Sequence, residues 1–256
     1  MPEGHVIHRA ANAQNKQLAG KELEVSSPQN RFSEGAKILS QIRCLKVEAF
    51  GKHLFYHFEN AHLLHIHLGL FGRIRTHKAP AHPPKGQVRV RLIAETMVVD
   101  INGPTICEIQ NIEEFQKTTR RIGPDLLRKD SDPEKFISKA QNSKRTIAAL
   151  LMDQSVIAGI GNIFRSEILW RNHIHPLKRG CNLEHGEIET LWNDSKMLLS
   201  LALKSGKIMT LLNSTQTQTK ERLNIYKKDV CPRCLGHVTA VVIENRNCYL
   251  CERCQT

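Results

Sequence analysis

Hydrophobic positions change from a helical to a strand-like pattern near the start of the chain. Between residues 5 and 19 the apolar side chains have helical spacing, and Gly20 follows as a helix stop. From about 22 to 110 short segments alternate or run apolar, for example KELEVSS, CLKVEAF, HLFYHF and QVRVRLIA, with turn residues between them. We therefore predict one helix followed by a β-sandwich or barrel.

The second half of the chain has the pattern of helices. DPEKFISKAQ opens with an Asp–Pro pair that favours a helix start, SKRTIAALLMDQ follows a cap expected at Ser143, and IFRSEILWR follows a glycine turn. A longer helix is expected over 184–204. The polar stretch 205–224, which contains NSTQTQTKE, predicts a mobile loop.

Positive charge is in excess along the chain. Lysine and arginine outnumber aspartate and glutamate by 37 to 25 in 256 residues, a formal charge of +12, which is typical of proteins that bind a partner rich in phosphates. An anionic membrane is the weaker alternative, because no long basic amphipathic segment is present. With no signal peptide and no apolar run of ~18 residues, we expect a cytosolic protein, in a bacterium one of the cytosol and nucleoid.

Four of the eight cysteines form CPRC and CERC near the C-terminus. Cys231, Cys234, Cys251 and Cys254 give the pattern C-x2-C-x16-C-x2-C, which is within the zinc-ribbon range. Four thiolates leave no open position, so we predict one structural Zn²⁺ per chain, worth ~10 kcal/mol to the folding of this module. The alternative is a coincidence of unligated cysteines.

The remaining cysteines are assigned other roles. Cys248 and Cys251 also form a C-x2-C pair, but ligation through Cys248 would shorten the intervening loop below the usual range. Cys44, Cys107 and Cys181 are scattered, and we expect them to be buried apolar side chains.

Two features of the second half suggest anion binding. Gly159, Gly161 and Asn162 precede the helix expected from Ile163, and backbone N–H groups at such a helix start can bind a phosphate, although a GxG is commonly only a tight turn. Between the cysteine pairs, two predicted strands place Arg246 near a hairpin tip. There it is either a solvated turn residue or a phosphate contact, and the charge of the chain favours the contact.

The opening tetrapeptide MPEG has two interpretations. Pro2 is ordinary at a first helical turn, and Glu3 would complement the helix dipole. Removal of Met1 would instead expose a secondary amine with a pKa of ~8, which is partly unprotonated and nucleophilic at neutral pH. These residues alone favour the first interpretation.

With MPEG at the start, AGIGNIFRSEIL and HIHP in the middle, and a four-cysteine finger ending in CQ, the sequence resembles the formamidopyrimidine-DNA glycosylase and endonuclease VIII family. The resemblance covers essentially the whole chain. It implies an α+β multidomain fold with an N-terminal helix and β-sandwich catalytic domain over 1–112, a helix–two-turn–helix DNA-binding domain over 120–222 and a zinc finger over 224–256. Damaged DNA would bind in the cleft between the halves, and we expect a monomer.

The resemblance also implies an activity, that of a bifunctional DNA glycosylase and abasic-site lyase of base excision repair. In this family the N-terminal proline, here Pro2, attacks C1′ of the damaged nucleotide, and the neighbouring glutamate, here Glu3, transfers protons. Lys52 in AFGKHLFY matches a strand lysine that binds phosphate and transfers a proton. The alternative for Lys52 is an exposed strand lysine. Loss of the base is followed by β,δ-elimination.

DNA contacts are implied at further positions. Asn162 matches the phosphate-binding asparagine, Arg246 the finger-tip arginine implicated in phosphate binding and the second elimination, and Arg121 in RRIGPDLL a DNA-contacting arginine of the endonuclease VIII branch. Extrusion of the damaged base usually needs an apolar wedge. Leu70 and Phe71 in HLGLFGR occupy the wedge loop, although such a pair is more often core.

Departures from the family pattern bear on the lesion. The family often has glutamate where this chain has Val6, and Gly69 replaces a glutamine that precedes the wedge leucine in some endonuclease VIII proteins. DINGPTICEI lacks the arginine–phenylalanine pair of the formamidopyrimidine branch, and LLNSTQTQTKERLNIYKKD lacks the glycine–threonine pattern that caps 8-oxoguanine there. We therefore expect oxidised pyrimidines. The alternatives are an 8-oxoguanine or formamidopyrimidine glycosylase, and a non-catalytic zinc-finger DNA-binding protein.

His65 and His67 share a strand face in HLLHIHL and invite a metal interpretation. No third ligand is suggested nearby, so we expect strand or DNA-facing residues.

Overall fold

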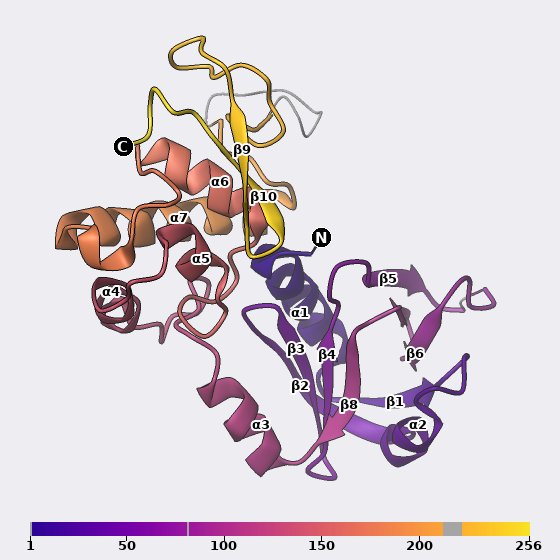
Figure 1. The fold of residues 1–256 in the computed structure, drawn as a ribbon. Helices are drawn as coiled ribbons and strands as arrows, with labels where there is room; N and C mark the ends of the chain where they lie inside the picture. Colours follow the sequence, from indigo (N-terminus) through magenta and orange to yellow (C-terminus); the bar gives the residue numbers. More distant parts are fainter. Residues whose placement is uncertain (1, 81, 212–221) are drawn as a thin grey trace. The chain divides into compact units, whose positions relative to one another are not determined.

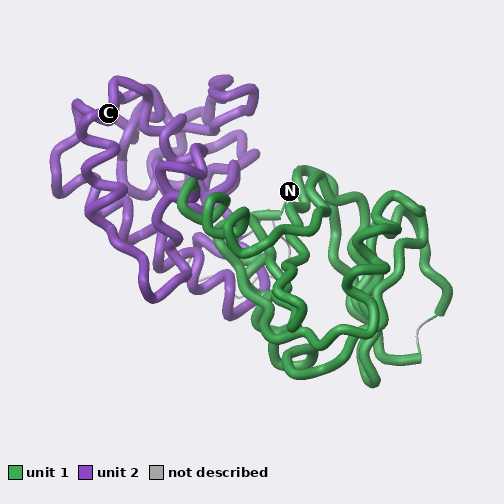
Figure 2. The backbone as a smooth tube through the Cα atoms, turned by 90° about the horizontal axis from the view of Figure 1, so that it is seen from below, with its two compact units in different colours: residues 1–121 green, residues 122–256 purple. Residues whose placement is uncertain are grey.

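The structure, a computed structural model, describes residues 2–80, 82–211 and 222–256 (Figure 1). These residues form two compact units, 1–121 and 122–256, coloured separately in Figure 2. The finger cysteines belong to the second unit. The predicted boundaries of three domains stay a prediction.

Unit 1 contains one helix, a series of antiparallel strands and two short helices. In chain order these are α1 (Gly4–Leu18), β1 (Lys21–Ser26), α2 (Ser33–Leu39), β2 (Ile42–Phe50), β3 (His53–Phe58), β4 (Leu63–His67), β5 (Arg73–Lys78), β6 (Val88–Ile93), β7 (Met97–Asn102), β8 (Ile106–Gln110) and α3 (Ile112–Arg120).

The strands form a sandwich whose two sheets share β1. The strand order is β5-β7-β6-β1-β2-β3-β4-β8, in which the first half of β1 pairs with β2 and the second half with β6. The core is formed by residues from both sheets, such as Leu54 and Ile66 from one and Val90 and Val99 from the other. The predicted sandwich is therefore confirmed, and its inward-facing positions are the apolar ones seen in the sequence.

Helix α1 is fixed to β2 and β3 by buried polar bonds as well as by its apolar stripe. The hydroxyl of buried Tyr56 donates to Gln14 Oε1 over 2.5 Å, and the backbone N–H of Val47 donates to Asn15 Oδ1 over 2.8 Å. Ile7, Ala11 and Leu18 are buried in the same core. These contacts hold the helix whose first turn follows Pro2.

Unit 2 is a group of helices followed by a two-stranded hairpin. The elements are α4 (Pro133–Gln141), α5 (Ile147–Met152), α6 (Asn162–Arg171), the 3-10 turn η1 (Gly180–Asn182), α7 (His185–Ser205), β9 (Thr239–Ile243) and β10 (Arg246–Leu250). The helices share a core that includes Phe136, Phe164, Leu169 and Trp192.

The local capping signals were largely correct in unit 2. Asp132 caps α4 by accepting from the N–H of Glu134, with Pro133 as the first helical residue. The cap predicted at Ser143 was wrong, because α5 starts at Ile147 and its cap is Thr146, whose hydroxyl accepts from Ala149 N. The hydroxyl of Ser143 accepts from the N–H of Arg145 instead.

Several expectations need correction. Helices α2 and α3 were not predicted, although Asn111 and Glu114 form a complete capping box at the start of α3. Cys44 is buried as expected, whereas Cys181 is exposed and Cys107 only partly buried. Most of the loop predicted over 205–224 lies outside the described residues.

The described helices have a further common property. None of them is long and apolar enough to cross a membrane.

Buried His5 and half-buried His53 make stability depend on pH in a defined direction. Burial, with Arg9 nearby, lowers the pKa of His5 to about 4. Burial, followed by the neighbouring His67, His65 and Lys52, lowers the pKa of His53 to about 3. Both side chains ordinarily titrate near 6.5, so the unfolded chain takes up protons first as the pH falls.

We predict that the free energy of unfolding is flat above about pH 7 and falls below it, by up to ~1.4 kcal/mol per pH unit for each of His5 and His53. Urea unfolding between pH 8 and pH 5 measures this, and the double variant H5Q/H53Q should flatten the fall. A wild-type stability that is equal at pH 5 and pH 7 contradicts the prediction.

Candidate active site

Pro2 lies just ahead of α1 and outside its first turn. The helix begins at Gly4, and Glu3 is its N-cap residue, with φ −112° and ψ 171°. The interpretation of Pro2 as a first-turn residue was therefore wrong. Pro2 is half-buried and Glu3 is fully buried, an environment that a helix cap on the surface does not require.

A pocket of about 420 Å³ opens beside Pro2. Val6, Arg9 and Ala10 of α1 line it, and the opposite wall includes Leu68, Gly72 and residues 73–76 of β5. None of the described residues that line it is acidic, while the arginines at positions 9, 73 and 75 are cationic. These guanidinium groups disfavour a further positive charge and attract anionic groups.

Lys52 occupies the tight turn between β2 and β3, whereas it had been expected on a strand. Phe50 pairs with His53, which leaves Gly51 and Lys52 as a two-residue loop. Gly51 has φ +56°, the left-handed conformation that such turns require and that favours glycine. The turn therefore presents Lys52 at the end of a rigid hairpin.

The loop between β4 and β5 presents two exposed apolar side chains. Leu70 is 47% exposed and Phe71 88% exposed, which excludes the alternative that this pair belongs to the core. The N–H of Gly72 donates to Leu68 O, and a Cβ at position 72 would lie 2.3 Å from that oxygen. Glycine is therefore required at position 72 for the turn that displays Leu70 and Phe71.

A chain of histidines connects β3, β4 and β8. His53 Nδ1 lies 2.8 Å from His65 Nε2, and His65 Nδ1 lies 3.0 Å from Glu108 Oε1. Burial, partly offset by Glu108, lowers the pKa of His65, and burial together with Lys52 and His65 lowers that of His67. His65 and His67 do share a strand face, as the sequence suggested, and His53 of β3 contacts His65. In the described residues the one potential metal-binding group found contains none of them.

In unit 2 the glycine turn before α6 is braced by Gln154. Its Oε1 accepts from the N–H of Gly159, and its Nε2 donates to Ile160 O over 3.0 Å. Gly159 has φ +96°, a conformation that strongly favours glycine. Gly161 is the N-cap of α6 and supplies no side-chain cap, so a phosphate contact at this helix start stays a prediction.

Arg165 brings Asn162 and Arg246 together. This fully buried side chain donates to Ile243 O, Arg246 O and Asn162 Oδ1 over 3.2, 3.2 and 2.5 Å. Asn162 Nδ2 in turn donates to Asn247 O. Sequence reasoning did not single out Arg165, although a charge within an otherwise apolar helix was a signal.

Arg246 opens β10 directly after a two-residue turn. Glu244 and Asn245 both have positive φ, 52° and 57°, and Ile243 pairs with Arg246. This is the turn geometry expected of a tight hairpin, and the predicted position of Arg246 near the tip is confirmed. Arg121, by contrast, is exposed at the C-terminal end of α3, where unit 1 ends.

Glu167, two residues after Arg165, was also missed. Its buried carboxylate accepts from the hydroxyl of Thr210, from the side chain and backbone N–H of Asn224, and from the backbone N–H groups of residues 225 and 226. Such a carboxylate is well compensated despite its burial. Glu167 thus fixes the segments on both sides of residues 212–221.

The four predicted ligand cysteines lie together. Their sulfur atoms are all within 4.8 Å of one another, with Cys231 and Cys254 3.9 Å apart and Cys234 and Cys251 3.5 Å apart. A tetrahedron with Zn–S bonds of about 2.3 Å has edges of about 3.8 Å. The donor set therefore fits a structural zinc ion.

The pKa values of two cysteines in the cluster shift in opposite directions. Burial and the neighbouring thiols raise the pKa of Cys254 to about 12. Burial would also raise the pKa of Cys231, but hydrogen bonds from backbone N–H groups and from the Trp170 indole lower it to about 6. Cys248 is buried against Ser166 outside the cluster, as predicted.

The structure thus assembles two groups of predicted site residues, each within one unit. In unit 1, Pro2 shares a pocket with residues that flank the loop of Leu70 and Phe71. In unit 2, the glycine turn, Asn162 and Arg246 meet around Arg165. A nucleophile candidate, two exposed apolar side chains, a helix start fixed by Gln154 and a four-cysteine cluster are the features expected of an enzyme that acts on nucleic acid.

Comparison with known proteins identifies the family. Residues 1–106 match the formamidopyrimidine-DNA glycosylase N-terminal domain, and residues 122–214 match the formamidopyrimidine-DNA glycosylase H2TH domain. Endonuclease 8 1 of Mycobacterium bovis is 37% identical over the whole of both chains. The formamidopyrimidine-DNA glycosylase of Thermomicrobium roseum is 29% identical over 86% of this chain and 84% of its own.

A solved structure shows the same fold. The complex between the Lactococcus lactis Fpg protein and DNA that contains an abasic site superimposes with a TM-score of 0.83, at 22% identity and over 99% of both chains. The chain belongs to the formamidopyrimidine-DNA glycosylase and endonuclease 8 family. It is accordingly a DNA glycosylase with abasic-site lyase activity in base excision repair.

The structural role of the hydrogen bonds donated by the Arg165 guanidinium group can be tested directly. We predict that R165M leaves the carbonyls of Ile243 and Arg246 without their donor and lowers the free energy of unfolding by ~2–4 kcal/mol. R165K keeps the charge but cannot reproduce the planar fork, so it should recover less than half of the loss. Urea unfolding of zinc-loaded protein measures this, and wild-type stability of both variants would refute the assignment.

Proposed function

We propose that this chain removes oxidised bases, preferentially pyrimidines, from DNA through an iminium intermediate on Pro2 and cleaves the strand by β,δ-elimination. The observation that carries the proposal is the position of Pro2, which lies outside α1, next to buried Glu3 and at the edge of a pocket of about 420 Å³. Removal of Met1 would make its nitrogen a secondary amine at this pocket.

A secondary amine suits the reaction because its imine is necessarily a cationic iminium. The Pro2 nitrogen bonds to C1′ as the bond to the base breaks, and the base leaves with a proton. The bond between C1′ and O4′ then breaks, O4′ takes up a proton, and the opened sugar is joined to Pro2 as an iminium. The iminium withdraws electrons and makes the C2′ proton acidic. Loss of that proton expels the 3′ phosphate, a second elimination expels the 5′ phosphate, and hydrolysis of the remaining imine restores the amine.

Glu3 and Lys52 are proposed for proton transfer. Glu3 is adjacent to the proposed nucleophile and is buried. Burial favours proton transfer between Glu3 and a fixed neighbouring group over proton exchange with solvent. Lys52 stands in the rigid turn between β2 and β3, where an ammonium group can bind phosphate and return a proton.

Phosphate contacts are assigned to the second unit and to Arg121. The turn of Gly159 and Gly161 presents the start of α6, and Arg165 orients Asn162 beside the hairpin that carries Arg246. Exposed Leu70 and Phe71 are proposed to fill the gap left by the extruded base. A structural zinc ion would be held by Cys231, Cys234, Cys251 and Cys254, whose geometry suits it.

The pocket beside Pro2 supports pyrimidine lesions. Val6 is 39% exposed there, at a position where the family often has glutamate. The pocket therefore has an apolar side chain at this position and, among its described lining residues, no acidic acceptor for purine N–H groups. The 37% identity to Endonuclease 8 1 of Mycobacterium bovis, against 29% to the formamidopyrimidine-DNA glycosylase of Thermomicrobium roseum, favours the same branch. The proposed location is the bacterial cytosol and nucleoid.

We predict that P2G abolishes cleavage of an abasic-site duplex, with a rate loss of at least ~100-fold, because the nucleophilic secondary amine is lost. Affinity for an uncleavable abasic analogue should change less than about threefold, since phosphate contacts dominate binding. Gel cleavage and fluorescence anisotropy measure the two quantities. Unchanged cleavage by P2G would exclude Pro2 as the nucleophile and require another nucleophile, whereas a wild type that binds the duplex without cleaving it would favour the DNA-binding-protein alternative.

The lesion assignment has its own test. We predict that duplexes with thymine glycol or 5-hydroxyuracil release their base at least ~10-fold faster than duplexes with 8-oxoguanine, a ratio within the range of pocket discrimination. Cleavage of a preformed abasic site normalises for lyase activity, and V6E should alter base release while sparing that step. Faster release of 8-oxoguanine would assign the chain to purine lesions.

A further inference from the structure

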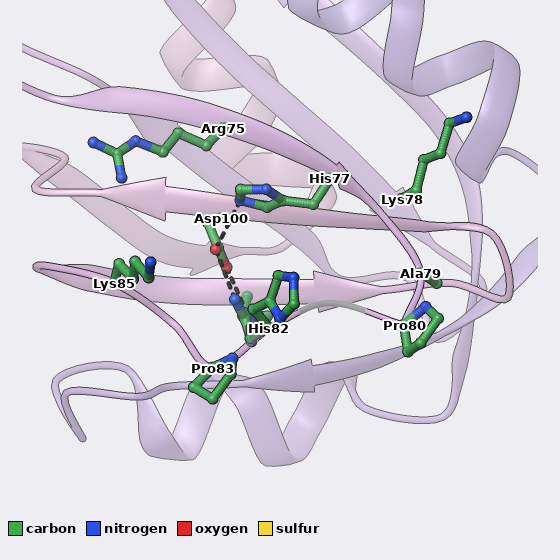
Figure 3. Close-up of a pocket in the computed structure, with 10 residues that line it drawn as sticks. Arg75, His77, Lys78, Ala79, Pro80, His82, Pro83, Lys85 and Asp100 are labelled. Carbon is green, nitrogen blue, oxygen red and sulfur yellow. Dashed lines mark hydrogen bonds and ion pairs between the residues drawn. The ribbon is translucent and has the colours of Figure 1, made fainter.

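A second pocket lies on unit 1 between β5, the edge strand of its sheet, and the segment that leads to β6. It has a volume of about 550 Å³ and is drawn in Figure 3. Its walls are Arg75, His77 and Lys78 of β5, Asp100 of β7, Arg91 of β6 and several residues of the connecting segment. None of the residues assigned to catalysis lines this pocket.

A buried ion pair supports the pocket floor. Arg91 donates from Nε and Nη2 to the two carboxylate oxygens of Asp100 over 2.6 and 2.7 Å, and these hydrogen bonds raise the pKa of Arg91. The remaining Nη1 donates to the backbone carbonyl of His82 over 3.1 Å, which ties the connecting segment to the sheet. His77 Nε2 lies 3.3 Å from Asp100 Oδ2, as the dashed line in Figure 3 shows.

The charges around this floor are unbalanced. Asp100 is the acidic residue of the lining, and its charge is already compensated by Arg91. Arg75, Lys78 and Lys85 add three exposed positive charges, and Figure 3 places Lys78 and Lys85 on opposite sides of the view. A concave surface with this excess of positive charge attracts an anion that carries phosphate, and the spread of the charges allows contact with more than one phosphate group.

The remaining walls are apolar rings and small side chains. Ala79, Pro80 and Pro83 line the pocket beside the imidazole of His82. The His82 imidazole is a flat aromatic ring on which a base can stack, the two prolines offer apolar contact to a sugar, and the phosphate can meet the neighbouring cations. Positive charge on an edge strand also prevents unwanted strand pairing, but that role would not need a concave surface fixed by Arg91.

Arg75 links this pocket to the one beside Pro2, because it lines both. Arg73, Arg75 and His77 alternate along β5 and therefore lie about 6.6–6.8 Å apart on one face. That spacing is compatible with successive phosphates of an extended strand. The positive charges thus continue along β5 from the pocket of Pro2 to the second pocket.

We propose that the pocket lined by β5 and by residues 79, 80, 82, 83 and 85 binds a nucleotide of single-stranded DNA, in a strand that continues beyond the duplex held at the lesion site. The path of the DNA from Pro2 along β5 rests on the proposed function, whereas the affinity of the pocket for single-stranded DNA does not. Partially single-stranded DNA, such as a gap or a frayed end, is therefore a preferred binding partner.

The test compares a duplex that carries an uncleavable abasic analogue, blunt or with an oligothymidine tail on either end, by fluorescence anisotropy at several salt concentrations. We predict that one tail position strengthens binding to the wild type ~10-fold at low salt. The variant K78E/K85E should lose this gain and reduce the salt slope by about 1.4, which corresponds to two single-strand phosphates. Its cleavage of a blunt abasic-site duplex should equal that of the wild type.

The matched control is K16E/K37E, which makes the same change in net charge at exposed lysines of unit 1 outside the pocket and should keep the tail gain. A wild type without a tail gain, or a K78E/K85E variant that keeps it, overturns the proposal. Stronger competition by free dTMP than by a short oligothymidine would overturn the strand in favour of a mononucleotide. If K78E/K85E instead lost cleavage of the blunt duplex but kept the tighter binding of tailed DNA, the claim that this pocket is separate from the active site would be refuted.

Discussion

Unit 2 depends on two buried, opposite charges of α6. Arg165 binds backbone carbonyls at the hairpin tip, and Glu167 binds the segments on both sides of residues 212–221. Neither charge could be buried without these partners, so the helix and the segments around it form cooperatively. Because α6 also begins at the glycine turn, one helix sets the positions of Asn162 and Arg246 together.

The same helix reaches the zinc finger. The Trp170 indole donates to Cys231 Sγ over 3.3 Å, and the Arg233 guanidinium lies 4.2 Å from the centre of the Trp170 ring. Zinc binding, which would order the finger, is therefore connected through Trp170 to the helix that orients the proposed phosphate contacts. Removal of the metal is expected to disturb DNA binding as well as the finger.

In unit 1, hydrogen bonds from the sheet hold α1 on the sandwich. Pro2 precedes this helix, which begins at Gly4. Tyr56 and Val47 fix α1 through Gln14 and Asn15. The cationic pockets then line the strand β5, which starts just after the exposed Leu70 and Phe71. The proposed nucleophile Pro2 thus shares a pocket with the start of β5, and Arg75 of this basic strand lines both pockets.

The sequence was sufficient for features that depend on local spacing. The cysteine pattern predicted its cluster, the apolar periodicity predicted α1 and α7, and Asp132 and Pro133 predicted a helix start. It was insufficient where long-range contacts decide, since the roles of Arg165 and Glu167 depend on partners more than 40 residues away. The pocket of Arg91 and Asp100 likewise requires the pairing of β6 with β7.

The central claim is that the nitrogen of Pro2 bonds to the sugar during catalysis. Borohydride reduction during turnover of an abasic-site oligonucleotide converts a transient iminium into a stable protein–DNA bond. We predict a crosslink that peptide mass analysis places on the N-terminal proline. Absence of a crosslink in zinc-loaded, DNA-binding protein, or a crosslink on a lysine, would contradict the claim.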